Sequence, residues 1–194
     1  MRNRTEALKY LSARSANLSQ NMTTGGKGGE FGWENVAGAL AHLDKPARIY
    51  TEIKYSTPGS ATETLKMVDQ QIWLQDYALY NYVVPMSIKE DWSSSGNSIL
   101  PKISKAALDE SLGVKTVHRK CGGRGWYMEP EQLKPVKCTC DNGYQQYTLK
   151  RISKSLGLDH QFFARSAWRS RYMSVLGYYN DMENRLIEVL HDNM

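Results

Sequence analysis

The sequence predicts a mainly α-helical protein that is interrupted by one short β-hairpin module. Apolar side chains recur every three or four residues in several segments, which is the period of a helix with one buried face. Glycine and proline residues separate these segments. All three cysteines fall in one basic, glycine-rich stretch, residues 121–140. At 194 residues the chain is long enough for one ordinary domain or two small ones.

Residues 1–30 are predicted to form a flexible N-terminal arm. Ser- and Asn-rich sequence leads into glycines at positions 25, 26, 28 and 29, a composition typical of linkers. The run around Lys27 looks superficially like a phosphate-binding loop. However, no Ser or Thr follows the lysine and no apolar strand precedes the run, so we interpret it as a linker.

The next part of the chain, residues 31–113, is predicted to form a helical body. Three segments carry the helical pattern: residues 33–43, 65–79 and 101–113. Pro46 follows the first segment and can open the next element. The second segment indicates a long, mostly buried helix that stops ahead of Pro85. The third begins at Pro101, because proline is favoured at the first helical position.

Residues 145–194 are predicted to form a basic helical region with the outline of a helix-turn-helix. A helix from about residue 147 ends at Gly157, which suits a left-handed helix terminus. Asp159 can cap a second helix that runs through Trp168. A last helix carries apolar side chains between Met182 and Leu190.

Four residues of the module at 114–144 have the chemistry of a zinc site: His118, Cys121, Cys138 and Cys140. Structural zinc takes four nitrogen or sulfur ligands at tetrahedral corners, and two close-spaced pairs separated by a hairpin provide that geometry. Cys138 and Cys140 are poor disulfide partners, because only one residue separates them and strand geometry keeps their side chains from meeting. We therefore predict one structural zinc ion, and a mainly α fold with a helical body, an inserted zinc-binding β-hairpin or knuckle module, and a helix-turn-helix-like C-terminal region.

Two other interpretations of these residues stay open. The cysteines can be reduced side chains that act as small buried hydrophobes near a surface histidine. A catalytic zinc needs an open fourth position and a nearby acid or base, whereas this ligand set is full and Glu129 and Glu131 lack the spacing of a metalloprotease motif. No nucleophile elbow or paired-carboxylate site stands out, so we expect neither enzymatic activity nor a small-molecule substrate.

Positive charge is concentrated in residues 114–171. Twelve Lys and Arg residues stand there against four Asp and Glu residues, whereas the rest of the chain carries thirteen basic and sixteen acidic residues. This distribution favours a phosphate backbone as the partner. The mean hydropathy of −0.56 and the lack of a long apolar run argue against a membrane partner, and we expect a cytoplasmic location.

We predict that the C-terminal region contacts double-stranded DNA through six side chains: Lys150, Arg151, Lys154, His160, Arg165 and Arg169. Arg165 and Arg169 are four residues apart, so on one helix they would share a face and reach one groove or one phosphate strand. The alternative is a solvated basic face on a purely structural helical hairpin.

The order of these parts resembles the lambda Q-type late-gene antiterminators of bacteriophages through the second half of the chain. The stretch His118-Arg-Lys-Cys121-Gly-Gly-Arg-Gly125 is similar to the first cysteine-and-glycine knuckle of that family, with His118 in place of the leading cysteine. The stretch Cys138-Thr-Cys140-Asp-Asn-Gly143-Tyr144 is similar to the second knuckle, with shorter spacings.

The resemblance implies a specific activity in the bacterial host cell. Such proteins bind a DNA site that overlaps a late promoter and engage RNA polymerase that its sigma factor holds in a promoter-proximal pause. They convert this polymerase into a form that reads through terminators. Two competing functions are a zinc-containing transcriptional repressor or activator without antitermination activity, and a nuclease, for which the sequence offers no convincing set of acidic metal ligands.

Overall fold

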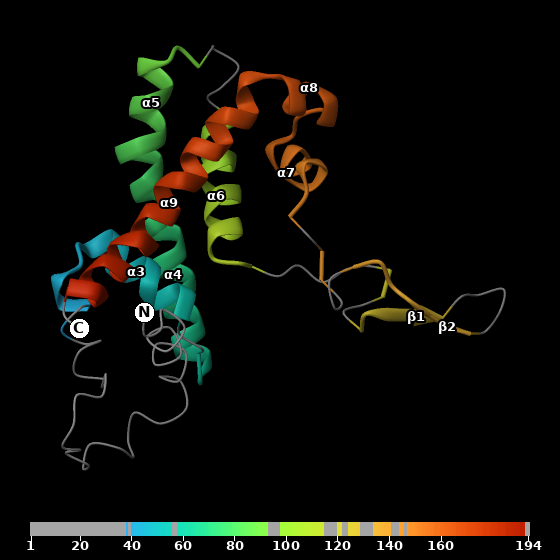
Figure 1. Ribbon diagram of the computed structural model, residues 1–194, viewed down its shortest axis with the longest axis horizontal. Helices are drawn as coiled ribbons and strands as arrows, with labels where there is room; N and C mark the ends of the chain where they lie inside the picture. The colour runs from blue at the N-terminus through green and yellow to red at the C-terminus, as the bar shows by residue number, and fades with distance from the viewer. Residues whose placement is uncertain are drawn as a thin grey trace.

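The structure is a computed structural model that describes most of the chain from residue 38 onward. The described residues are 38, 40–55, 58–92, 98–114, 120–121, 124–128, 134–140, 144–145 and 147–192. Within them the protein is mainly helical with one small two-stranded sheet, as predicted (Figure 1). The expected flexible arm, residues 1–30, and the expected zinc ligand His118 lie outside the described residues.

The first full helix of the body is α3, Lys45–Tyr55. Pro46 sits in its first turn as predicted, where no backbone N–H is required. The Asp44 side chain caps this end by accepting a hydrogen bond of 3.1 Å from the Ala47 backbone N–H. Ahead of α3, residues 40–42 are helical and Leu40 is buried, in agreement with the C-terminal part of the first predicted segment.

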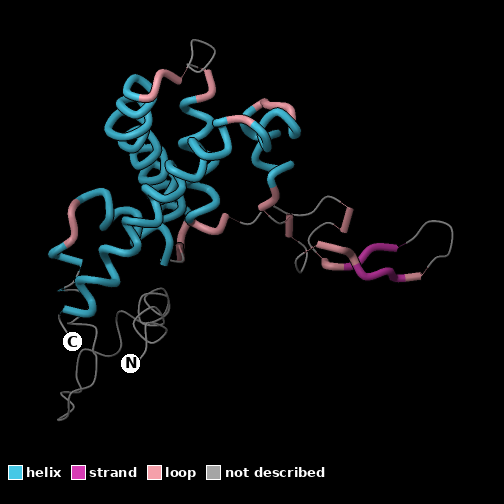
Figure 2. Tube along the Cα trace, turned by 45° about the horizontal axis from the view of Figure 1, so that its top comes forward, coloured by secondary structure: helices cyan, strands magenta, loops and turns pink. Residues whose placement is uncertain are grey.

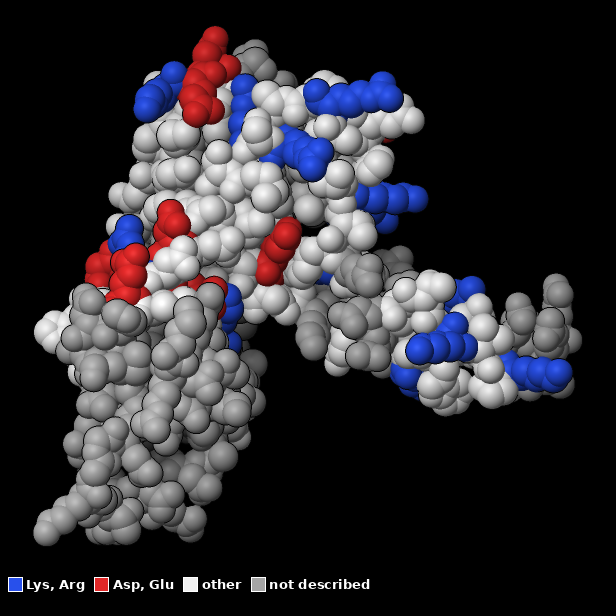
Figure 3. Space-filling view, viewed as in Figure 1, with Lys and Arg blue, Asp and Glu red and all other residues white. Residues whose placement is uncertain are grey.

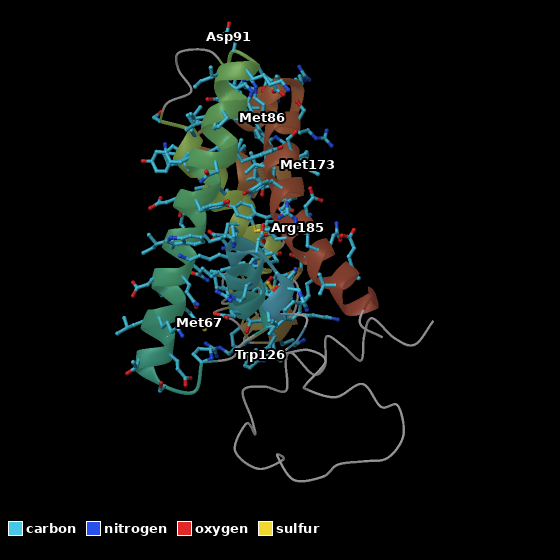
Figure 4. The ribbon with its side chains drawn as sticks, turned by 90° about the vertical axis from the view of Figure 1, so that its left-hand side faces the viewer. Met67, Met86, Asp91, Trp126, Met173 and Arg185 are labelled. Carbon is cyan, nitrogen blue, oxygen red and sulfur yellow. The ribbon has the colours of Figure 1, made fainter. Side chains whose placement is uncertain are left out.

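Helix α4, Ala61–Ala78, differs from the prediction in its burial. We expected a mostly buried helix, but Leu65, Val68 and Ile72 are 67%, 44% and 54% exposed. Only Leu74 and Ala78 of this helix are buried. The reason is tertiary: α4 and α5 form one edge of the body, opposite the edge formed by α9, so one side of α4 faces away from the other helices (Figure 4).

We predicted that this helix would stop ahead of Pro85, but it does not. It continues through the π-helical turn η1, Leu79–Val83, into α5, Val84–Lys89. In this turn the Val84 backbone N–H donates to the Leu79 carbonyl, five residues back. The wider turn accommodates a proline ring, which an ordinary α-helical turn excludes by a clash with the preceding carbonyl.

Four further helices complete the described fold: α6, Leu100–Ser111; α7, Leu149–Leu156; α8, His160–Arg165; and α9, Ala167–Asp192. Pro101 lies at the start of α6, and Gly157 ends α7 with a positive φ of 75°, both as predicted. Asp159 caps α8 by accepting hydrogen bonds of 2.9 Å from two backbone N–H groups, which confirms the predicted cap.

The body and the C-terminal region share one core. Helix α9 packs against α3 and α6, and Tyr50, Tyr172 and Tyr179 are each at most 1% exposed within it. Their hydroxyl groups are hydrogen-bonded: that of Tyr50 donates to the Ser111 carbonyl at 3.1 Å, and that of Tyr179 pairs with the Ser104 hydroxyl at 2.9 Å. The predicted module at 114–144 is therefore inserted between two parts of a single helical unit.

The small sheet lies beside this unit and projects from it (Figures 1 and 2). It consists of β1, Trp126–Met128, and β2, Pro135–Lys137, which pair antiparallel with Trp126 opposite Lys137. The hairpin between the two cysteine groups was predicted and is confirmed. No helix in the described part of the chain combines the length and apolar character that a membrane crossing needs.

Candidate metal centre and basic surface

The three cysteines meet at the base of the hairpin. Cys121 precedes β1, whereas Cys138 and Cys140 follow β2. Their sulfur atoms all lie within 4.8 Å of one another, and those of Cys121 and Cys140 are 3.6 Å apart. No disulfide joins them. The structure thus brings three of the four predicted ligands together.

Backbone hydrogen bonds at the base of the hairpin hold this arrangement. The Arg124 backbone N–H donates to the Cys121 carbonyl at 3.1 Å, which closes a turn after the first cysteine. Gly125 follows with φ of 76°, a left-handed conformation that favours glycine. Its carbonyl accepts a hydrogen bond of 2.8 Å from the Cys138 backbone N–H. The turn and the second cysteine group are thereby fixed side by side.

The spacing of Cys138 and Cys140 is compatible with a shared ligand position because β2 ends before them. The strand stops at Lys137, and the chain bends at residues 139 and 140. The geometry of a strand therefore does not set the directions of these two side chains. Both sulfur atoms approach that of Cys121 instead.

The donor set fits a thiophilic metal ion. Zinc–thiolate bonds of about 2.3 Å at tetrahedral corners place neighbouring sulfur atoms about 3.8 Å apart, close to the 3.6 Å between the Cys121 and Cys140 sulfurs. Cys121 and Cys138 are 3% and 5% exposed, and they are the only buried side chains among residues 120–121, 124–128 and 134–140. These cysteines can therefore hold a metal ion.

No family model, curated protein or solved structure matches this chain.

The predicted DNA-contacting residues lie on α7, α8 and the start of α9. Five of the six are exposed: Lys150, Lys154, His160, Arg165 and Arg169. Arg151 is mostly buried, because its guanidinium lies 3.9 Å from the centroid of the Tyr147 ring and donates to the Gln145 carbonyl at 2.9 Å. On the visible face, Lys and Arg side chains gather over α7, α8 and the start of α9, and acidic ones lie near α3, near the C-terminal part of α9 and at the end of α5 (Figure 3).

The prediction that Arg165 and Arg169 share a face of one helix is wrong. Helix α8 ends at Arg165, and α9 begins at Ala167. Between them Ser166 is extended, with φ of −94° and ψ of 169°. Its hydroxyl oxygen accepts a hydrogen bond from the Trp168 backbone N–H at 3.3 Å, so this serine caps α9 instead of continuing α8.

Helix α7 and the glycine turn after it match the prediction, whereas the second helix is shorter than predicted, because α8 ends at Arg165 and Trp168 belongs to α9. The turn after α7 is a Schellman motif, a helix end with a glycine in the left-handed conformation, in which the Leu158 backbone N–H donates to the Ser153 carbonyl at 2.9 Å. Backbone hydrogen bonds from Phe162 and its neighbours to the Asp159 carboxylate lower the pKa of that group. Because α8 spans only six residues, the helix-turn-helix interpretation stays a prediction.

Tyr147 connects the residues that follow the hairpin module to the end of α6, and sequence reasoning assigned it no such role. Its hydroxyl lies 2.8 Å from the Asp109 carbonyl oxygen and 2.7 Å from that of Val114, at the end of α6. The hydroxyl has one proton, which it donates to one of these two carbonyl oxygens at a time. Burial raises the pKa of this tyrosine. No local pattern could have revealed the contact, because its partners are more than thirty residues away.

Proposed function

We propose that the protein is a zinc-containing, DNA-binding transcription antitermination factor that engages promoter-proximally paused RNA polymerase and its sigma factor. The observation that carries the proposal is the convergence of three cysteine sulfurs at a hairpin that is inserted into a helical unit with a basic end. This combination agrees with the resemblance to phage late-gene antiterminators. The polymerase contact rests on that resemblance alone.

The metal is proposed to be one structural zinc ion held by Cys121, Cys138, Cys140 and His118. Thiolate and imidazole ligands suit zinc, and a full set of four protein ligands is typical of structural sites. The metal would replace the hydrophobic core that the hairpin lacks, since its only buried described side chains are two of the cysteines.

Metal analysis of the purified protein tests this assignment. We expect one zinc ion per chain, and a lower zinc affinity for His118→Ala. The matched control is His42→Ala, because His42 is an exposed histidine ahead of α3. A protein that retains full zinc affinity without His118 has a different fourth ligand, and a protein purified without any metal contradicts the zinc proposal.

Double-stranded DNA is proposed to bind at the exposed basic side chains of α7, α8 and the start of α9. Asp159 is the only acidic residue between positions 145 and 171, so the potential of this surface favours phosphates. The break at Ser166 changes the expected contact. Arg165 and Arg169 project from two different helices and would reach separate phosphates instead of one row.

The salt dependence of duplex binding tests this surface. Replacing Arg165 or Arg169 by alanine should weaken binding and lower the salt slope by up to about 0.9 for each phosphate that the side chain neutralises. Lys66→Ala, at an exposed position on α4, is the control and should leave the slope unchanged. An unchanged slope in both arginine variants would mean that neither side chain touches phosphate.

Run-off transcription across an intrinsic terminator separates antitermination from simple regulation. With its cognate promoter template, the protein should increase the share of transcripts that pass the terminator. Binding to the promoter without increased read-through would favour the second candidate, a DNA-binding repressor or activator in which the zinc module is architectural.

A further inference from the structure

The two faces of the hairpin differ in exposure. Side chains alternate along a strand, and directly paired residues lie on the same face of an antiparallel ladder. Trp126 and Met128 therefore share one face with their partners Lys137 and Pro135. We call these four residues the Trp126 face. All four are exposed, whereas Tyr127 on the opposite face is only partly so.

Trp126 is an unusual residue at such a position. Its side chain is 43% exposed, and the neighbouring Met128 is 48% exposed. No aromatic ring of the described residues stacks on the indole; its partner is the Arg124 guanidinium, 5.4 Å from the ring centroid. Clustered exposed apolar side chains with a polar rim mark binding sites in soluble proteins.

The described residues around the Trp126 face are positively charged, and Glu129, Glu131 and Asp141 lie outside the described residues. Residues 120–121, 124–128 and 134–140 include four basic side chains and no acidic one: Lys120, Arg124, Lys134 and Lys137. Figure 3 shows Lys and Arg side chains along the hairpin, with no acidic side chain among the described residues on the visible face. A partner that is both aromatic and anionic complements this surface best.

We propose that the Trp126 face binds single-stranded nucleic acid, with Trp126 stacking on a base and Arg124 and Lys137 contacting phosphates. Unpaired bases offer open faces to an aromatic side chain, and the flanking phosphates attract Lys and Arg. In a duplex the base faces are already stacked on each other. A purely apolar protein partner would leave the surrounding cations without counter-charge.

The size of the face limits the interaction to a short segment. A three-residue strand spans about 10 Å, the length of roughly two or three nucleotides. We therefore expect weak, salt-dependent binding with little sequence preference. This site is separate from the duplex surface proposed on α7, α8 and α9, and it does not depend on that proposal.

The test compares two ligands and two variants of the full-length, metal-loaded protein. The ligands are an unstructured oligonucleotide of about twelve nucleotides, made as RNA and as DNA, and a blunt duplex. Trp126→Ala should weaken single-strand binding by about 5- to 150-fold, which corresponds to one stacking contact of about 1–3 kcal/mol. Duplex binding should be unchanged. Tyr80→Ala, at an aromatic residue that is 69% exposed on η1, is the matched control.

A second variant guards against misfolding of the hairpin. Lys137→Gln keeps the strand and should lower the salt slope of single-strand binding by about 0.7, the value for one phosphate on a single strand. Metal content must equal that of the wild type in both variants. Binding to RNA alone, to DNA alone or to both supports the proposal and identifies the source of the strand.

Several results would overturn the proposal. These are no single-strand binding by the wild type, equal loss of single-strand and duplex binding in Trp126→Ala, or unchanged binding in both variants. Unchanged nucleic-acid binding with loss of RNA polymerase binding would assign the face to a protein partner. The Arg165 and Arg169 variants test the duplex proposal, and their outcome does not depend on the result for the Trp126 face.

Discussion

In the helical unit that the body and the C-terminal region form together, here called the body, Tyr172 and Tyr179 are buried among apolar side chains from helices that are far apart in sequence. In the hairpin, the only described side chains that are buried are Cys121 and Cys138. The body is thus stabilised by removal of apolar surface from water, which requires many residues. A two-stranded sheet of this size cannot bury enough surface, so we infer that its structure depends on an ion held by the cysteines.

Removal of the metal should have the largest effect, and it should be confined to the hairpin. Structural zinc sites bind with about 10–16 kcal/mol in small peptides, which exceeds what such a hairpin gains otherwise. Cys138→Ser or a strong chelator should make the module sensitive to protease. The body should keep its cooperative melting in circular dichroism. Protease resistance that survives complete metal loss would show that the hairpin is stable without an ion.

Ile103→Ala tests the opposite side of the comparison. Ile103 is fully buried in α6, and truncation of such a side chain leaves a cavity that costs about 2–5 kcal/mol. The free energy of unfolding of the body, measured by urea denaturation, should fall by this amount. Zinc content should be unchanged. Loss of zinc together with body stability would mean that the two regions fold as one unit.

Alkaline pH should weaken the body through its tyrosines. Burial raises the pKa of Tyr178 to about 12 from its ordinary value of 10.0. Burial also raises the pKa of Tyr172 and Tyr179. Because these pKa values are raised in the folded protein, the stability that the neutral hydroxyl groups contribute is complete below about pH 10. It is lost as the pH rises toward the pKa that each group has in the folded protein.

Thermal melting of the helices between about pH 9 and pH 12 measures this effect. The melting temperature should fall across the range, and that of Tyr178→Phe should fall less than that of the wild type. The hairpin should show the reverse dependence, since protons compete with the metal for thiolates at low pH. A body that melts at the same temperature throughout would contradict the burial of these hydroxyl groups.

Tyr147→Phe should have the smallest effect, at the point where the chain re-enters the helical unit after the hairpin. It removes the hydroxyl that bridges the Asp109 and Val114 carbonyls, and one hydrogen bond contributes about 1 kcal/mol. We expect a correspondingly small loss of stability in urea denaturation. Tyr80→Phe, at an exposed site, should cause none. Equal effects of the two substitutions would show that the bridge does not stabilise the protein.

Local features of the chain were predicted well because their causes are local. Pro101, Gly157 and Asp159 act on the backbone within a few residues, so the start of α6, the end of α7 and the start of α8 could be inferred from single positions. The cysteine grouping was predictable for the same reason, because metal ligands on short turns lie close in sequence. The fourth ligand stays a prediction.

Tertiary structure alone decided which apolar side chains of the helices are buried. Leu65, Val68 and Ile72 have the spacing of a buried face, yet α4 lies at the edge of the body and leaves them exposed. The partly buried Arg151 is held by local contacts instead, since the Tyr147 ring and the Gln145 carbonyl are only four and six residues away.

The sequence by itself therefore determined the helical character of the fold, the starts of α6 and α8, the end of α7 and the position of the cysteine hairpin. The packing of α9 on α3 and α6 was decided by contacts between distant segments. The break at Ser166 is a local cap that sequence reasoning missed. Periodicity identifies an apolar face, but it carries no information about which partner covers that face, because burial depends on residues that are far away in the chain.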